Sequence, residues 1–168
     1  MNREKLLKEA EKHFFEATRH GWVAGAKGTP VCDTLSMPGF KETIYEKSGF
    51  HVRDRYIVSS LGGKSFGTTT VSYLLNVVWV MSYGGYYPKD VIPFLKQALM
   101  AAYEKSEFLG GRGPLHFEKE GTDICAELIY KNNPEKNFFP DFKGYEVIIS
   151  QKTFVPLGSH WYHGMSLI

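Results

Sequence analysis

Cysteine is scarce in this chain, and long apolar runs are missing from it. Only Cys32 and Cys125 occur among 168 residues, and they lack the spacing of metal ligands. The first residues have no apolar core of a signal peptide, so we expect reduced thiols in a cytoplasmic protein. No apolar run reaches about 18 residues, so no membrane span is expected.

An excess of charge of one sign is also missing. Lys and Arg number 20 and Asp and Glu number 18, which gives a formal net charge of +2. Proteins that bind nucleic acid electrostatically concentrate positive charge on one surface. We therefore expect no nucleic-acid partner for this chain alone.

A phosphate-binding loop is suggested by one stretch but is not complete. Gly63-Lys64-Ser65 resembles the end of such a loop, yet Val58 stands where the pattern needs glycine. A β-prone segment follows, where the pattern needs a helix. The glycines are better explained as a turn between strands, and no cofactor is expected.

Aromatic residues are abundant, at 15% of the chain, and favour a sheet because flat rings pack well on a pleated surface. The most apolar and β-prone stretch is Phe66–Tyr87, which predicts strands over Gly67–Leu74 and Val77–Tyr83. A weaker copy occurs at Phe142–Gly164. A further short strand is predicted at Trp22–Ala24.

Two segments have the periodicity of amphipathic helices. In residues 1–20, apolar side chains repeat every three or four positions, and Asn2 is a predicted N-cap. A second helix is predicted over residues 90–105, with Asp90 as its N-cap and Pro93 in its first turn.

The second half of the chain repeats features of the first. Tyr45–Gly49 resembles Phe117–Gly121, and later in the chain Phe66 matches Phe142. One strand-rich unit cannot bury its own apolar face, whereas two such units can share a core.

The fold class predicted from these patterns is α+β. We expect a curved antiparallel sheet built from two similar β units, residues 43–85 and 113–164. An N-terminal helix and a central linking helix at 90–105 complete a single domain of residues 1–168.

Short motifs of aromatic residues, glycine and Arg-Gly-Pro follow one another in a fixed order: Tyr56 after Asp54, Phe66-Gly67, Trp79-x-Met81-x-Tyr83-x-Gly85, Phe94-Leu95-x-x-Ala98-Leu99, Arg112-Gly113-Pro114, Phe142-x-Gly144-x-Glu146 and Tyr162-x-Gly164. This order resembles an uncharacterised bacterial family, a domain of unknown function. Its members occur alone or behind an XRE-type helix-turn-helix domain in transcriptional regulators.

The resemblance runs from about Phe14 to the C-terminus and implies the fold. The family has no established activity, so the resemblance implies no mechanism. This chain departs from the family pattern at Thr70, where an acidic residue is usual, and it lacks the DNA-binding helices.

Asp54 breaks the pattern of a predicted strand over Phe50–Ser60. Apolar residues alternate with polar ones along this strand, and Asp54 falls on the apolar face. A carboxylate in that position must be paired, lie at an edge or face a cavity. Two alternatives stay open: Asp54 bonds backbone donors near a β-bulge, or it points into a pocket.

Aromatic residues with a few polar groups are typical of small-molecule pockets, and they yield a set of ligand-binding candidates: Asp54, Tyr56, Trp79, Tyr83, Arg112, Glu146 and His160. The same mix, with Trp161 and Tyr162, is typical of an aromatic core, which is the interpretation we favour for the rings. Arg112 among glycines suits either an anion-binding nest or a simple helix end.

A metal site is not expected. His160 and His163 are three residues apart, which on a strand places them on opposite faces. Purified protein should therefore contain no stoichiometric zinc or iron.

Three classes of function stay open, and the oligomeric state is not predicted. We rank first a non-enzymatic small-molecule-binding or sensing module, which predicts a cavity with Asp54 or Arg112 at its wall. An enzyme of unknown reaction predicts two or more titratable groups with perturbed pKa values in one cleft. A protein-protein interaction domain predicts an exposed aromatic patch or open sheet edge without a cavity.

Overall fold

The computed structural model describes residues 1–31, 38–119 and 127–168. The predictions for Cys32 and Cys125 lie outside these residues. Within the described chain the elements are α1 (Arg3–His20), η1 (Trp22–Ala24), β1 (Thr29–Pro30), β2 (Lys41–Lys47), β3 (Phe50–Val58), β4 (Ser65–Tyr73), β5 (Asn76–Tyr86), η2 (Lys89–Val91), α2 (Ile92–Lys105), β6 (His116–Glu118), β7 (Leu128–Phe138), β8 (Asp141–Ser150) and β9 (Pro156–Ser166).

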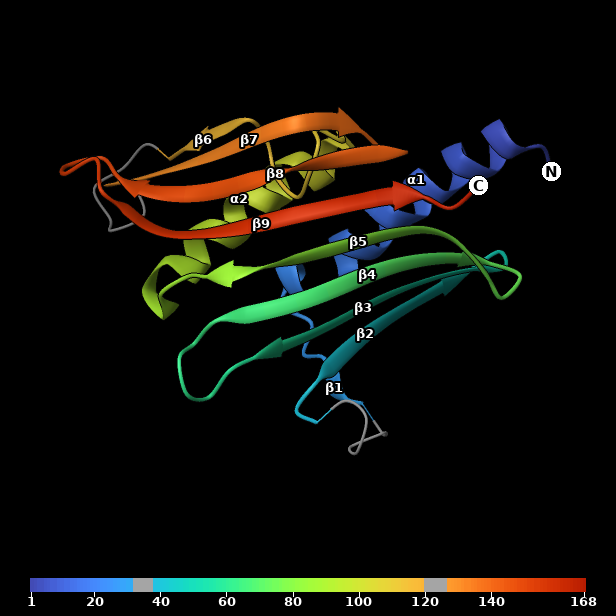
Figure 1. Ribbon diagram of the computed structural model, residues 1–168, viewed down its shortest axis with the longest axis horizontal. Helices are drawn as coiled ribbons and strands as arrows, with labels where there is room; N and C mark the ends of the chain where they lie inside the picture. The colour runs from blue at the N-terminus through green and yellow to red at the C-terminus, as the bar shows by residue number, and fades with distance from the viewer. Residues whose placement is uncertain (32–37, 120–126) are drawn as a thin grey trace.

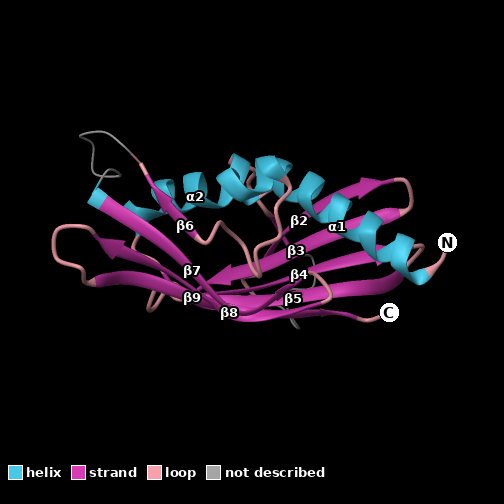
Figure 2. Ribbon diagram, turned by 90° about the horizontal axis from the view of Figure 1, so that it is seen from above, coloured by secondary structure: helices cyan, strands magenta, loops and turns pink. Residues whose placement is uncertain are grey.

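The strands form one antiparallel sheet of nine strands in the order β1-β2-β3-β4-β5-β9-β8-β7-β6 (Figure 1). Both α-helices lie over the same face of this sheet, and its edges curve toward them (Figure 2). The predicted α+β class with a curved antiparallel sheet is therefore confirmed. Neither α-helix of the described chain has the length and hydrophobicity needed to span a bilayer.

Helix α2 separates the strands into two sets along the chain, as predicted. Strands β1 to β5 precede it and β6 to β9 follow it. The two sets join where β5 pairs with β9, with Tyr83 opposite Tyr162. Because antiparallel neighbours continue across this join, both sets contribute to one concave face.

The strand pairing places two glycines in the same position relative to tyrosines of neighbouring strands. Gly67 lies opposite Tyr83 on the neighbouring strand, and Gly144 lies opposite Tyr162 in the same way. Thr69 and Glu146 each lie two residues after one of these glycines, and their side chains are buried. In the strand register, Thr69 and Glu146 therefore lie at similar positions relative to Tyr83 and Tyr162.

Helix α1 follows its sequence pattern closely. The Asn2 side chain accepts a hydrogen bond from the Lys5 backbone N–H at 2.9 Å, as an N-cap does. The buried side includes Phe14 and Phe15, whose rings meet at 5.3 Å. This apolar stripe packs against the concave face of the sheet.

Two local predictions are wrong. Trp22–Ala24 is a 3₁₀ turn and not a strand, because the Gly25 N–H bonds back to the Trp22 carbonyl at 3.0 Å. Asp90 caps no helix, since it lies within the 3₁₀ turn Lys89–Val91 and α2 begins only at Ile92.

The core between the helices and the sheet is built from aromatic rings. Trp79 is fully buried and lies 4.7 Å from the Phe139 ring and 5.1 Å from the Phe14 ring. Its indole N–H donates to the Phe139 carbonyl at 2.7 Å. Trp79 shares its strand face with Tyr83, as the alternation predicts.

Candidate functional site

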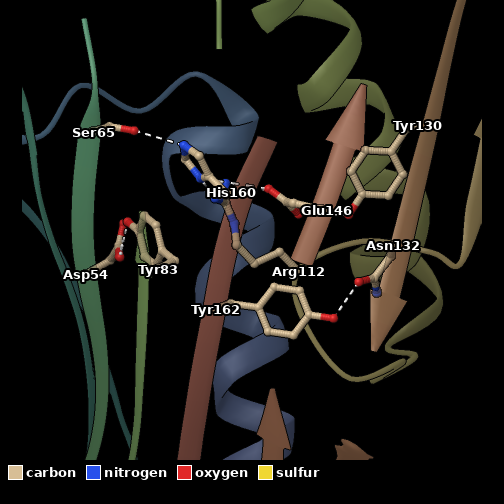
Figure 3. A network of polar contacts seen from close by, with 9 residues as sticks. All are labelled: Asp54, Ser65, Tyr83, Arg112, Tyr130, Asn132, Glu146, His160 and Tyr162. Carbon is tan, nitrogen blue, oxygen red and sulfur yellow. Dashed lines mark hydrogen bonds and ion pairs between the residues drawn. The ribbon is translucent and has the colours of Figure 1, made fainter. Parts of the chain in front are cut away.

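A group of polar side chains crosses the concave face of the sheet from β3 to β8. We call Asp54, Tyr83, Arg112, Glu146 and His160 the polar cluster (Figure 3). Four of these residues come from β3, β5, β8 and β9, and Arg112 comes from the segment between α2 and β6. The structure therefore brings together most of the residues that the sequence singles out.

Asp54 uses only one of its two carboxylate oxygens. Oδ1 accepts hydrogen bonds from the Thr69 hydroxyl at 2.9 Å and from the Tyr83 hydroxyl at 2.8 Å. Among the described residues, Oδ2 has no hydrogen-bond partner. Burial raises the pKa of the Asp54 carboxyl above its ordinary value, although both hydrogen bonds lower it. Since both donors are side chains, the alternative with backbone donors is wrong.

The charge of Arg112 is balanced inside the protein. Its Nη1 lies 3.3 Å from Glu146 Oε1 and donates to His160 Nδ1 at 2.7 Å. The guanidinium carbon also lies 4.6 Å from the centre of the Tyr83 ring. Arg112 is 7% exposed and Glu146 is fully buried, so this ion pair is shielded from solvent.

Ser65, His160 and Glu146 have the outline of a hydrolase triad. Ser65 Oγ lies 2.9 Å from His160 Nε2, and Glu146 Oε1 lies 3.9 Å from His160 Nδ1. Ser65 also stands in the sequence Gly63-Lys64-Ser65-Phe66-Gly67, which fits the Gly-x-Ser-x-Gly pattern of hydrolases.

Arg112 prevents this trio from working as a triad. A guanidinium can only donate, so His160 Nδ1 must accept and Nε2 must carry the proton. The imidazole then donates to Ser65 and cannot remove the proton of its hydroxyl. Burial, and after it the charge of Arg112, lowers the pKa of His160 to about 3. Ser65 also opens a strand and not a helix, unlike a nucleophile elbow.

A cavity of about 950 Å³ lies beside the polar cluster. Its wall is mostly apolar and comes mainly from α1, η1, strands β2 to β5 and α2. Asp54, Tyr83, Arg112 and His160 all lie on this wall. Val58 lines the cavity and is 58% exposed, which places it at the opening.

Tyr87 adds a buried hydroxyl to the cavity wall. Its side chain is 7% exposed, and its hydroxyl has no hydrogen-bond partner among the described residues. Burial raises the pKa of Tyr87, with a further contribution from the charge of Glu146, so the hydroxyl keeps its proton. The effect of Glu146 on this pKa indicates that the Tyr87 hydroxyl lies near the Glu146 carboxylate, toward the polar cluster.

Two other candidates stand apart from the polar cluster. Tyr56 lines the cavity on β3, but its hydroxyl approaches Gly28 and not Asp54. Trp79 belongs to the core and does not line the cavity, so the structure gives no support to its prediction as a ligand-binding residue. Trp161, included among the aromatic residues, is 61% exposed on the opposite face.

Thr69, Ser65 and Tyr87 are not among the site residues predicted from the sequence. Thr69 is detectable by alternation, because it falls between Gly67 and Val71 on the buried face of β4. Ser65 is detectable from its glycine pattern. Nothing in the sequence distinguishes Tyr87 from its exposed neighbour Tyr86.

His160 and His163 point to opposite faces of β9, as their spacing predicts: His160 is buried and His163 is exposed. Within residues 1–31, 38–119 and 127–168, no three His, Cys, Asp or Glu side chains gather as metal ligands do.

Comparisons with protein-family models, with curated proteins and with solved structures find no match to this chain.

Gly67 leaves space for the Tyr83 ring, and this gives a testable prediction. A Cβ at Gly67 would overlap the Tyr83 ring and hydroxyl, so Gly67→Ala must displace the side chain that bonds Asp54. We expect the free energy of unfolding to fall by about 1–3 kcal/mol, measured by urea denaturation. Gly62→Ala is the matched control because no atom lies within 4 Å of its new Cβ. Equal free energies of unfolding for both variants would contradict the close approach of the Tyr83 ring to Gly67.

Proposed function

We propose that this protein is a non-enzymatic small-molecule-binding or sensing module. The observation that carries this proposal is the cavity of about 950 Å³, within the range of ligand pockets, whose polar wall atoms are incompletely bonded. Asp54 Oδ2 lacks a hydrogen-bond partner among the described residues. An apolar cavity with a few such polar groups favours an apolar molecule with a polar end.

A thermal-shift screen of small molecules tests the proposal. A ligand that binds only the folded state raises the unfolding temperature. To show that a hit binds in the cavity, we use Thr43→Trp, since Thr43 lines the cavity and lies opposite Asp54 on β2. Thr70→Trp, with the new ring on the other face of the sheet, is the matched control.

We expect hits to stabilise the wild type and Thr70→Trp but not Thr43→Trp. The proposal is wrong if no compound stabilises the wild type. It is also wrong if every hit stabilises Thr43→Trp as strongly, because the ligands would then bind elsewhere.

Asp54→Asn is expected to leave the free energy of unfolding at neutral pH unchanged or higher by up to about 1 kcal/mol. An amide oxygen can still accept from Thr69 and Tyr83, and the cost of the buried charge disappears. Because burial raises the pKa of Asp54, its contribution to stability is present at low pH and lost as the pH rises through that pKa. Urea melts over a pH series check this. The loss of stability with rising pH that Asp54 causes in the wild type should be missing from Asp54→Asn. A large loss of stability at neutral pH would contradict the account.

An enzyme is the second candidate, favoured by two perturbed groups in one cleft. The pKa of Asp54 is raised and that of His160 is lowered, mainly by burial in both cases. Asp54, with a free oxygen on the cavity wall, is the group placed to remove a proton from a substrate. Mass spectrometry of each hit after incubation separates the two functions. Conversion by the wild type and none by Asp54→Asn would support the enzyme.

A protein-interaction domain fits less well. The outer face carries an exposed aromatic pair, since Tyr145 and Trp161 lie 4.9 Å apart and are 37% and 61% exposed. That class predicts such a patch in a protein without a cavity, whereas this chain combines the patch with a large cavity. Sedimentation of wild type and Trp161→Ser tests the patch, because self-association through it should be lost in the variant.

The cellular location and the family of this protein are also proposals. We propose a cytoplasmic location and membership of the uncharacterised bacterial family whose motif order the chain resembles. An internal repeat is supported by matching contacts, because Tyr83 donates to Asp54 at 2.8 Å and Tyr162 donates to Asn132 at 2.5 Å. A fluorescent fusion found outside the cytoplasm would contradict the location.

A further inference from the structure

We infer that the ligand carries a protonated amine on an apolar body, and that Asp54 Oδ2 accepts a hydrogen bond from this amine. The inference rests on the proposed binding function and names the chemical class of its ligand. It is carried by the charges of the polar cluster, by the free oxygen of Asp54 and by the rings of the cavity wall.

The charges of the polar cluster do not cancel. Glu146 and Arg112 form an ion pair at 3.3 Å and balance each other. His160 is neutral, because the Arg112 guanidinium donates to its Nδ1. Asp54 receives only hydroxyl donors, from Thr69 and Tyr83, so its ionised form has no ion-pair partner. An ionised Asp54 thus leaves one negative charge at the inner wall of the cavity.

Other charged residues of the cavity do not cancel this charge. Glu42 is paired with Arg55 at 3.0 Å and with Arg53 at 3.6 Å. Lys27 and Lys89 line the cavity, but their side chains are exposed and solvent screens them. The inner wall therefore attracts a cation and repels a carboxylate.

The aromatic rings of the cavity wall are also suited to bind a protonated amine. The cavity is lined by aromatic side chains from several elements: Trp22, Tyr45, Tyr56, Tyr83, Tyr86 and Tyr87. Ring faces attract cations, and two such contacts already exist in the protein. Arg112 lies over Tyr83 at 4.6 Å, and Lys96 lies over Trp22 at 4.5 Å. An amine on an apolar body would meet rings on its sides and Asp54 at its end.

Three probes with the same indole body and linker test the class: tryptamine, tryptophol and indole-3-propionate. Each competes with N-phenyl-1-naphthylamine, an uncharged fluorophore that reports occupation of the cavity. We expect tryptamine to displace it at a concentration about tenfold lower than tryptophol, because a hydrogen bond between charged groups is stronger than a neutral one. Indole-3-propionate should be the weakest competitor.

Asp54→Asn should abolish the advantage of tryptamine over tryptophol. The affinity of the variant for the fluorophore is measured first, so that each competing concentration can be converted into an affinity. The matched control is Asp90→Asn, an exposed aspartate outside the cavity, which should compete like the wild type.

The inference is overturned if tryptophol or indole-3-propionate competes as well as tryptamine. It is also overturned if the advantage of tryptamine survives in Asp54→Asn. In either case the fluorophore still binds and the proposed function stands. Failure of the fluorophore to bind at all would overturn both.

Discussion

Arg112→Met is expected to lower the free energy of unfolding by about 3–5 kcal/mol. Glu146 is fully buried, and its Oε1 has the Arg112 guanidinium, 3.3 Å away, as its ion-pair partner. Methionine fills much of the same space but leaves the carboxylate uncompensated in the protein interior. The same change removes the donor to His160 Nδ1 and the cation over the Tyr83 ring. Urea denaturation of the variant and the wild type measures the loss.

The double variant Arg112→Met with Glu146→Gln shows whether Arg112→Met loses stability through the unpaired charge of Glu146 or through poorer packing. Glutamine is neutral and can still accept from the Tyr130 hydroxyl, which donates to Glu146 Oε2 at 2.8 Å. We expect the double variant to recover most of the stability that Arg112→Met loses, because no buried charge is left unpaired. If the double variant is as unstable as Arg112→Met, packing and not charge explains the loss.

Trp79→Ala is expected to cost about 3–5 kcal/mol, the usual range for truncation of a buried aromatic side chain. Trp79 is fully buried between the rings of Phe14 and Phe139, at 5.1 and 4.7 Å. The truncation also leaves the Phe139 carbonyl without the indole donor at 2.7 Å. Thermal and urea denaturation, followed by circular dichroism, check the prediction.

Trp79→Phe provides the control for Trp79→Ala. A phenyl ring keeps most of the ring contacts and loses the N–H, so we expect a smaller cost of about 1–3 kcal/mol. Equal costs for both variants would show that the hydrogen bond, and not ring packing, holds this part of the core. Since Trp79 does not line the cavity, binding of N-phenyl-1-naphthylamine to Trp79→Phe should be unchanged.

The regular elements could be predicted because their patterns are local. Helix α1 has an apolar stripe and an N-cap at Asn2, and both act within a few residues. The hairpin of β4 and β5 was predicted because both strands lie in a β-prone run. Its turn is at Leu74-Leu75, where both residues have positive φ, one residue before the predicted position. Short-range preferences fix an element's type more firmly than its ends.

The predictions that failed concern features that depend on tertiary contacts. Asp90 has the side chain of an N-cap, but the 3₁₀ turn before α2 places it one residue before the N-cap position, which is Val91. Thr69 is absent from the predicted site, although the strand register places it directly opposite Asp54. Register depends on pairing across strands, which a single sequence does not specify.

The candidate site was predictable only in part. Asp54 stands out because a carboxylate interrupts an apolar strand face, and that signal is local. The pairing of Arg112 with Glu146, and the contact of His160 with Ser65, join elements that are far apart in the chain. The cavity was not predictable, because its volume depends on which space the helices leave unfilled above the sheet.

A fluorescence titration of N-phenyl-1-naphthylamine tests the central claim, that the cavity beside Asp54 binds a small molecule. We predict saturable binding of one equivalent by the wild type and by Thr70→Trp. Binding should be at least about tenfold weaker in Thr43→Trp, whose new ring occupies the cavity. Equal affinities of the wild type and Thr43→Trp, or the absence of saturable binding to the wild type, would contradict the account.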